Sequence, residues 1–207
     1  MTKTLIALLS TAGLLAACSL PPSQADVDKA SADMLKTSFQ PRGIAPLDRL
    51  EQDQAKAACV QADVSGKPLD AKLVKAIEEA NMKTIKWPAD GKFLGDWKAG
   101  ERVAQTGVGM QWSDNEKTVN GGNCYACHQL SPQEVSFGNI GPSLKHYGKL
   151  RGNSEAVVKY TWGKIWNTHA FNACSSMPRF GDAGILTETQ IKDVMALLLD
   201  PNSPVNK

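Results

Sequence analysis

The sequence lacks a strong net charge, a sustained strand pattern and any long apolar run after its first residues. Its 207 residues hold 23 lysines and arginines against 21 aspartates and glutamates, so the formal net charge is only +2. This balance gives no reason to expect a nucleic-acid partner. Alternation of apolar and polar residues is sustained nowhere, and no internal repeat is present. With 42% hydrophobic and 21% charged residues, the chain has the composition of a folded globular protein. Its helical stretches and the missing strand pattern predict an all-α fold.

The apolar run that is present lies at the start, and residues 1–25 are the predicted export segment. Lys3 precedes a run from Leu5 to Ala17 that is too short for a comfortable membrane span. Two processing sites compete. Leu-Ala-Ala-Cys ending at Cys18 resembles a bacterial lipobox, in which the cysteine is lipidated, whereas Ser23-Gln24-Ala25 suits ordinary signal peptidase. Either site predicts a periplasmic protein, with a lipid anchor at Cys18 in the first case.

Stretches of helix formers, separated by turn residues, predict an N-terminal helical extension over 26–90 and a second domain over 91–207. A capping box that begins at Thr187 marks the last helix, which Asp200-Pro201 ends. Val158, Trp162 and Trp166 form one stripe, which we interpret as core. The predicted helices cover 27–39, 47–64, 69–85, 96–106, 154–168 and 187–200.

The residues Cys124-Tyr125-Ala126-Cys127-His128 form a C-x-x-C-H motif. Two thiols at this spacing can add across the vinyl groups of a haem, and the adjacent histidine can then bind the iron. A zinc knuckle and a redox dithiol are the alternatives. Zinc usually needs a second ligand pair at similar spacing, and a thioredoxin-like dithiol needs a βαβ setting, neither of which the sequence has. The motif therefore predicts one covalent haem c, attached through Cys124 and Cys127 and ligated by His128.

The opposite face of the iron needs a second ligand, for which Met177 is the favoured residue. It stands in an irregular segment before the last helix, where Pro178 biases it toward an extended conformation. Histidine and methionine together are a common ligand pair in cytochromes c. The carbonyl of Pro142 is the expected acceptor for the second ring nitrogen of His128. Weaker ligand candidates are His146, His169, Met82, Met110 and Met195.

Two cysteines remain once the haem pair and Cys18 are set aside. Cys59 and Cys174 would then share a compartment in which disulfides persist. We expect a disulfide between them that pins the extension to the segment presenting Met177. Two separate buried thiols are the alternative, because sequence does not give geometry.

Residues 97–206 resemble a class I cytochrome c, with a first helix, C-x-x-C-H, a Gly-Pro-x-Leu segment, a Met-Pro loop and a closing helix. The segments 122–128, 138–144, 176–181 and 191–201 are more specifically similar to the X subunits of Sox AX cytochrome complexes, which take part in periplasmic thiosulfate oxidation. A long loop before Cys124 and the N-terminal extension depart from the core pattern of this family.

The resemblance implies a heterodimer with an A-type subunit that carries one or two haems and the catalytic residues. The complex would act as an L-cysteine S-thiosulfotransferase, joining thiosulfate oxidatively to a cysteine of a carrier protein. This chain would have no catalytic residue of its own and would pass electrons to a small cytochrome c. The alternative is a free-standing periplasmic or lipid-tethered electron carrier.

Overall fold

The computed structural model describes residues 21–207, so the apolar leader and Cys18 lie outside the described residues. Its regular elements over this range are helices, with a single isolated bridge between Arg42 and Ala45. The all-α expectation is confirmed. None of the helices in this range is long and apolar enough to cross a membrane. The chain divides into two compact units at Pro41, and the second unit runs from Arg42 to Lys207. The expected boundary between extension and cytochrome domain, near residue 90, stays a prediction.

The first unit contributes one helix, α2 (Gln24–Ser38), whose residues are all exposed. Its start is fixed by a capping box, in which Ser23 and Asp26 bond reciprocally to each other's backbone and side chain. The helix therefore begins at Gln24 and not at Val27, the start that the sequence pattern predicts.

The extension within the second unit holds two α-helices, α3 (Gln54–Ser65) and α4 (Ala71–Met82), after a short 3-10 turn η1 (Leu47–Leu50). The prediction of one helix over 47–64 was wrong. Asp53 has an extended backbone, and its carboxylate accepts a hydrogen bond of 2.8 Å from the N–H of Lys56, which caps α3. Asp70 caps α4 in the same way, so this helix also starts later than its helix-forming residues suggest.

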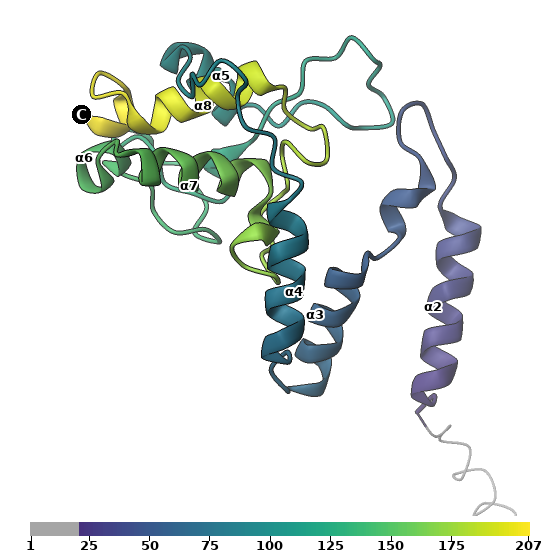
Figure 1. Ribbon diagram of the computed structural model, residues 1–207. Coiled ribbons are helices and arrows are strands. Elements are labelled where there is room, and N and C mark those ends of the chain that lie inside the picture. The colour runs from purple at the N-terminus through teal and green to yellow at the C-terminus, as the bar shows by residue number, and fades with distance from the viewer. Residues whose placement is uncertain (1–20) are drawn as a thin grey trace, which may run out of the picture. The chain divides into compact units, whose positions relative to one another are not determined.

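The C-terminal part of the second unit, where the sequence predicts a cytochrome domain, holds four α-helices and three 3-10 turns. The helices are α5 (Trp97–Gln105), α6 (Tyr147–Arg151), α7 (Glu155–Trp166) and α8 (Glu188–Leu199), and the turns are η2 (Cys124–Ala126), η3 (Thr168–Ala170) and η4 (Pro204–Asn206). Figure 1 shows α5 against α8, with α7 running below them. The two backbones touch at Gly100, where a Cβ would stand 2.1 Å from the carbonyl oxygen of Asp193. The fully buried side chains include Trp162, Ile191, Met195 and Leu197.

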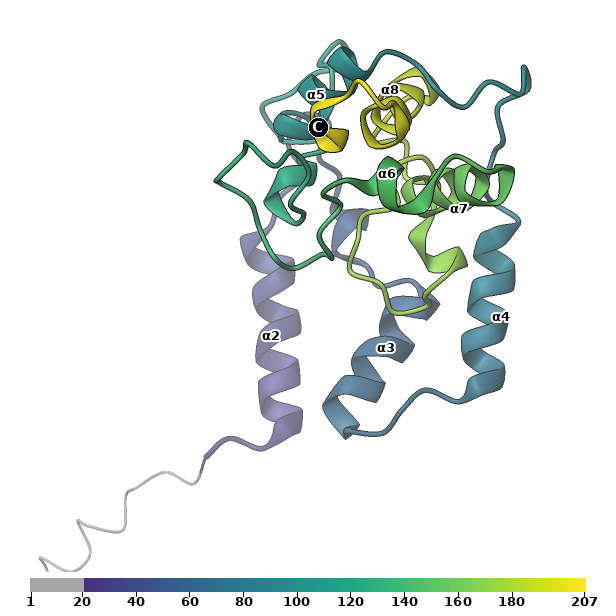
Figure 2. The same cartoon turned by 90° about the vertical axis from the view of Figure 1, so that its left-hand side faces the viewer.

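The extension meets the C-terminal part where α4 packs against η3, the turn that follows α7 (Figure 2). Here it is bonded to α7 through the tryptophans of the predicted stripe. The indole N–H of Trp162 donates to the carbonyl of Lys86 at 2.9 Å, and that of Trp166 donates to the carbonyl of Thr84 at 3.2 Å. Both tryptophans belong to the core, as expected. Their polar edges, however, hold the end of the extension, a role that the apolar stripe alone does not reveal.

Candidate functional site

The C-x-x-C-H motif folds into a tight turn that brings its thiols and imidazole together. Asn123 enters the turn in the left-handed region at φ 46°, and η2 follows. The N–H groups of Cys127 and His128 both donate to the carbonyl of Cys124, at 3.1 and 2.9 Å. Cys124 and Cys127 are both partly buried free thiols, so the turn has not closed on itself as a disulfide.

A second segment, 138–144, is bonded along the length of this turn. The N–H groups of Gly138, Gly141 and Leu144 donate to the carbonyls of Tyr125, Cys127 and Gln129, at 2.8, 2.8 and 2.7 Å. A Cβ at Gly138 would lie 1.8 Å from the carbonyl oxygen of Ala126, so only glycine permits this approach. The segment thus holds the motif against a fixed backbone frame.

The imidazole of His128 is fixed in one tautomer and one orientation by this segment. Its Nδ1 lies 2.7 Å from the carbonyl oxygen of Pro142, and because a carbonyl only accepts, Nδ1 must carry the proton. The Nε2 of the neutral ring then offers a lone pair, and no residue from 21 to 207 bonds it. Gly141 completes the cradle, since a Cβ there would stand 2.2 Å from the imidazole ring. This is the arrangement that a haem iron needs from its histidine ligand.

The Cys124 thiol is poorly suited to dithiol exchange. Burial raises the pKa of the Cys124 thiol to about 12, so the protonated form persists at neutral pH. Zinc binding and dithiol exchange both require a thiolate. Across residues 21–207, no three His, Cys, Asp or Glu side chains are grouped so that they could hold a metal ion.

Comparison with known proteins agrees with the geometry. Residues 113–200 match the cytochrome c family. The chain therefore contains a cytochrome c domain. It is also 36% identical to a protein described as an uncharacterised lipoprotein of Aquifex aeolicus (strain VF5), over 99% of this chain and 98% of that protein. The cofactor of the family is covalently bound haem c, and the function that the domain implies is electron transfer.

The residues of the cytochrome fit this group. Cys124 and Cys127 would carry the two thioether bonds, and His128 would offer Nε2 to the iron while Pro142 holds its Nδ1. The haem supplies the one-electron chemistry, and these residues attach it, orient the ring and set its tautomer.

Met177, the predicted second ligand, lies partly buried in a loop that is tied down on both sides. Its side chain packs against the main core, and its N–H donates to the hydroxyl of Ser175 at 3.3 Å. After it, the N–H groups of Gly181 and Asp182 both donate to the carbonyl of Trp166 at 3.1 Å. The backbone on both sides of Met177 is thus bonded in place, and its role as an iron ligand stays a prediction.

Among the other candidate ligands, Met195, Met82 and His169 have environments that favour other roles. Met195 is fully buried in α8, as expected of a core residue, and Met82 is 39% exposed at the end of α4. Met110 and His146 both have left-handed backbones, at φ 63° and 57°. His169 is buried, and its Nε2 donates to the carbonyl of Ser175 at 3.1 Å.

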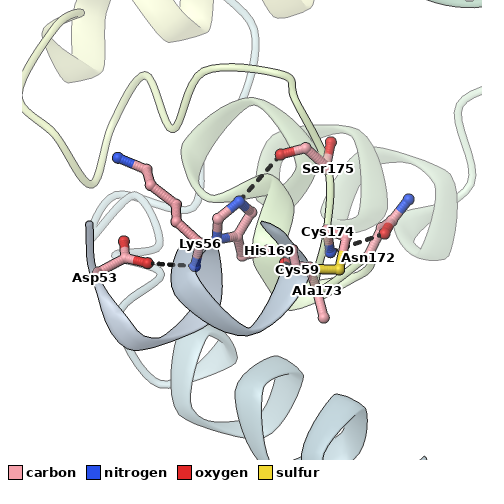
Figure 3. The surroundings of a disulfide bond; sticks show 8 residues. All are labelled: Asp53, Lys56, Cys59, His169, Asn172, Ala173, Cys174 and Ser175. Atoms are coloured by element: carbon pink, nitrogen blue, oxygen red, sulfur yellow. Dashed lines mark hydrogen bonds between the residues drawn. A yellow bond between two sulfur atoms is a disulfide. The ribbon is translucent and has the colours of Figure 1, made fainter. Parts of the chain in front are cut away.

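The structure joins Cys59 of α3 to Cys174 in a disulfide of 2.07 Å (Figure 3). Next to it, the guanidinium of Arg179 pairs with the carboxylate of Asp53 at 2.9 Å. Cys174 and Arg179 stand on either side of Met177, so α3 holds this loop by one covalent and one ionic link. We call these two links the α3 clasp. The sequence predicts the disulfide through cysteine usage, but it gives no signal for the ion pair.

A partly buried pair, Glu101 on α5 and Tyr125 within the C-x-x-C-H motif, is a further feature that the sequence does not reveal. The phenol of Tyr125 donates to the Oε1 of Glu101 at 2.9 Å. The two residues come from different elements, and neither has a spacing that marks it as part of a motif.

Proposed function

We propose that the protein is a monohaem electron-transfer cytochrome whose iron is ligated by His128 and Met177. The observation that carries this proposal is the His128 ring, whose Nδ1 is bonded to Pro142 and whose Nε2 is left for the metal. The tied loop around Met177 supports the second ligand. Two strong ligands would give a six-coordinate, low-spin iron that exchanges electrons without binding substrate.

Absorption and magnetic circular dichroism spectra of the purified ferric protein test this ligand pair. Low-spin spectra with a thioether charge-transfer band are expected for the native chain, and Met177→Ala should lose that band. Met195→Leu is the matched control, because Met195 is packed within α8 and its loss should leave the band in place. An unchanged spectrum in Met177→Ala would contradict the role of Met177.

We further propose that this cytochrome works as the X-type subunit of a Sox AX complex in the periplasm. The support is the similarity of segments 138–144 and 176–181 to that family, together with an extension clasped onto the Met177 loop. An A-type subunit would then perform the thiosulfate chemistry. This chain would take the electrons and pass them to a small cytochrome c.

A second candidate is a lipid-tethered electron carrier without a catalytic partner. The full-length similarity to the Aquifex aeolicus lipoprotein favours it. The structure adds one observation: Ser23 caps α2, so cleavage after Ala25 would remove the cap, whereas processing at Cys18 would retain it. A lipid anchor alone is also compatible with an X-type subunit, so the presence of a partner is what distinguishes the two candidates.

Purification of the native protein from its own membranes and periplasm, followed by intact mass measurement, distinguishes them. Copurification with a second haem subunit, and thiosulfate-dependent reduction of this haem only when that subunit and a carrier protein are present, would support the Sox role. A monomer that exchanges electrons with membrane redox complexes, in a strain whose thiosulfate oxidation survives deletion of this chain, would support the carrier.

A further inference from the structure

The carboxyl group of Glu101 is held in an incompletely satisfied site beside the haem-attachment turn. Its Oε1 accepts bonds from the phenol of Tyr125 at 2.9 Å and from the side chain of Gln105 at 3.0 Å. Its Oε2 is buried and has no hydrogen-bond partner among residues 21–207. An ionised carboxylate with a buried, unbonded oxygen is costly, and protonation removes most of that cost.

The groups that face Glu101 offer no positive charge to offset the cost. Tyr125 and Cys124 face it from η2, Glu134 faces it from the loop that follows the motif, and Gln105 lies on its own helix. Helix α8 also packs on α5, but its charged residues meet other positions, such as Asp193 at the N–H of Asp96. Burial raises the pKa of Glu101, the bond from Tyr125 lowers it in part, and the charge of Glu134 adds a smaller rise.

The pair lies next to a surface pocket that can supply protons. A hollow of about 480 Å³ is lined by Gln105, Tyr125, Glu134 and neighbouring residues. Tyr125 itself is only 6% exposed, and the N–H of Ser131 donates to its oxygen at 3.3 Å. Tyr125 thus lines the pocket and bonds Glu101, so solvent protons are available next to the carboxyl.

The same phenol links the carboxyl to the haem motif. Tyr125 directly follows Cys124 within the turn, and both residues belong to or pack against the main core. Because the carboxylate is bonded to the turn that would carry the haem, we expect its proton affinity to depend on the charge on the iron. Reduction removes one positive charge and so weakens the attraction that keeps the carboxyl ionised.

We propose that Glu101 binds one proton from solvent when the haem iron accepts an electron, and releases that proton when the electron leaves. The balance is one electron from the donor redox protein and one proton from solvent, which converts the carboxylate to a carboxylic acid as ferric iron becomes ferrous. No covalent bond other than the new O–H is made or broken. This property goes beyond electron transfer and does not depend on which partner the cytochrome serves.

The test is a redox titration of the full-length holoprotein with small chemical mediators at a series of pH values. Glu101 should have one pKa in the oxidised protein and a higher pKa in the reduced protein. At pH values in the interval between these two, the midpoint potential should fall as pH rises. The limiting slope is about 59 mV for each tenfold fall in proton concentration, as for any one-electron, one-proton couple. Glu101→Gln should abolish this fall while leaving the haem spectrum unchanged, because glutamine preserves the shape of the side chain.

Two further variants test the direction of the effect. Tyr125→Phe removes a bond that favours the carboxylate, so the interval should move to higher pH. Glu134→Gln removes a negative charge, so the interval should move to lower pH. A pH dependence that is the same in Glu101→Gln as in the native protein would assign the proton to another group and overturn the proposal.

Infrared difference spectra of the reduced minus the oxidised protein provide a second readout. A carboxylic-acid C=O band should be gained on reduction, shift with isotope-labelled glutamate and change frequency in Tyr125→Phe. Its absence from the native protein at every pH in the interval would overturn the proposal, even if Glu101→Gln did not fold. Because mediators replace the natural donor, a missing Sox partner would leave these results unaffected.

Discussion

The disulfide between Cys59 and Cys174 offers a quantitative test of how the extension contributes to stability. It joins residues that are 115 positions apart, and in the chain-entropy model a closed loop of that size stabilises the folded state by about 4.8 kcal/mol. Measured values are usually smaller, because residual order in the unfolded state reduces the entropy that the bond removes. Replacing both cysteines by serine should therefore lower the free energy of unfolding by about 2–4 kcal/mol.

Denaturant unfolding of the ferric holoprotein, followed by tryptophan fluorescence, measures this change, since Trp162 and Trp166 are buried against the extension. Hydrogen exchange should also become faster in the loop around Met177, because the remaining part of the α3 clasp is an ion pair with partly exposed side chains. The single variant Lys72→Ser, on an exposed position of α4, is the matched control for serine substitution outside the clasp. A double cysteine variant within about 0.5 kcal/mol of the native protein would refute the reasoning.

Three other substitutions have defined outcomes. Gly141→Ala should reduce the yield of correctly ligated haem, seen in the haem absorption per protein, because the new Cβ would meet the ring of His128. Trp166→Phe should destabilise the fold by about 1 kcal/mol in denaturant unfolding, through the loss of its N–H bond to the extension. Burial works to raise the pKa of Asp53, but the Lys56 N–H and the Arg179 guanidinium outweigh it and hold that pKa below its ordinary value. The stabilisation from this lowered pKa is complete above the unfolded-state pKa of Asp53 and is lost as pH falls through its folded-state pKa. Arg179→Gln should therefore lower the free energy of unfolding by up to about 1 kcal/mol at neutral pH and by progressively less in acid.

The parts of this cytochrome that could be predicted from sequence are those in which one residue type has one dominant role. The C-x-x-C-H motif predicts haem because few other chemistries use that spacing. The capping box at Thr187 predicts the start of α8, which begins at Glu188. Asp53 carries a similar signal at the start of α3, but the helix formers on either side of it concealed the break.

The attachment of the extension could not be predicted in the same way. Trp162 and Trp166 bond to backbone carbonyls of residues 84–86, and a carbonyl is present at every position of the chain. The Asp53–Arg179 pair spans 126 positions, and nothing local to either residue indicates its partner. Long-range polar contacts of this kind depend on how the elements pack against one another. The residue pattern within a single element does not indicate that packing.

The measurement that tests the central claim most directly is a near-infrared magnetic circular dichroism spectrum of the ferric protein, paired with potentiometry, for the native chain and Met177→His. We predict a thioether band in the native protein, its replacement by a bis-imidazole signature in the variant, and a lower midpoint potential with haem attachment intact. If the native spectrum lacks the thioether band, or if the variant retains both the native spectrum and the native potential, His128 and Met177 are not the axial pair.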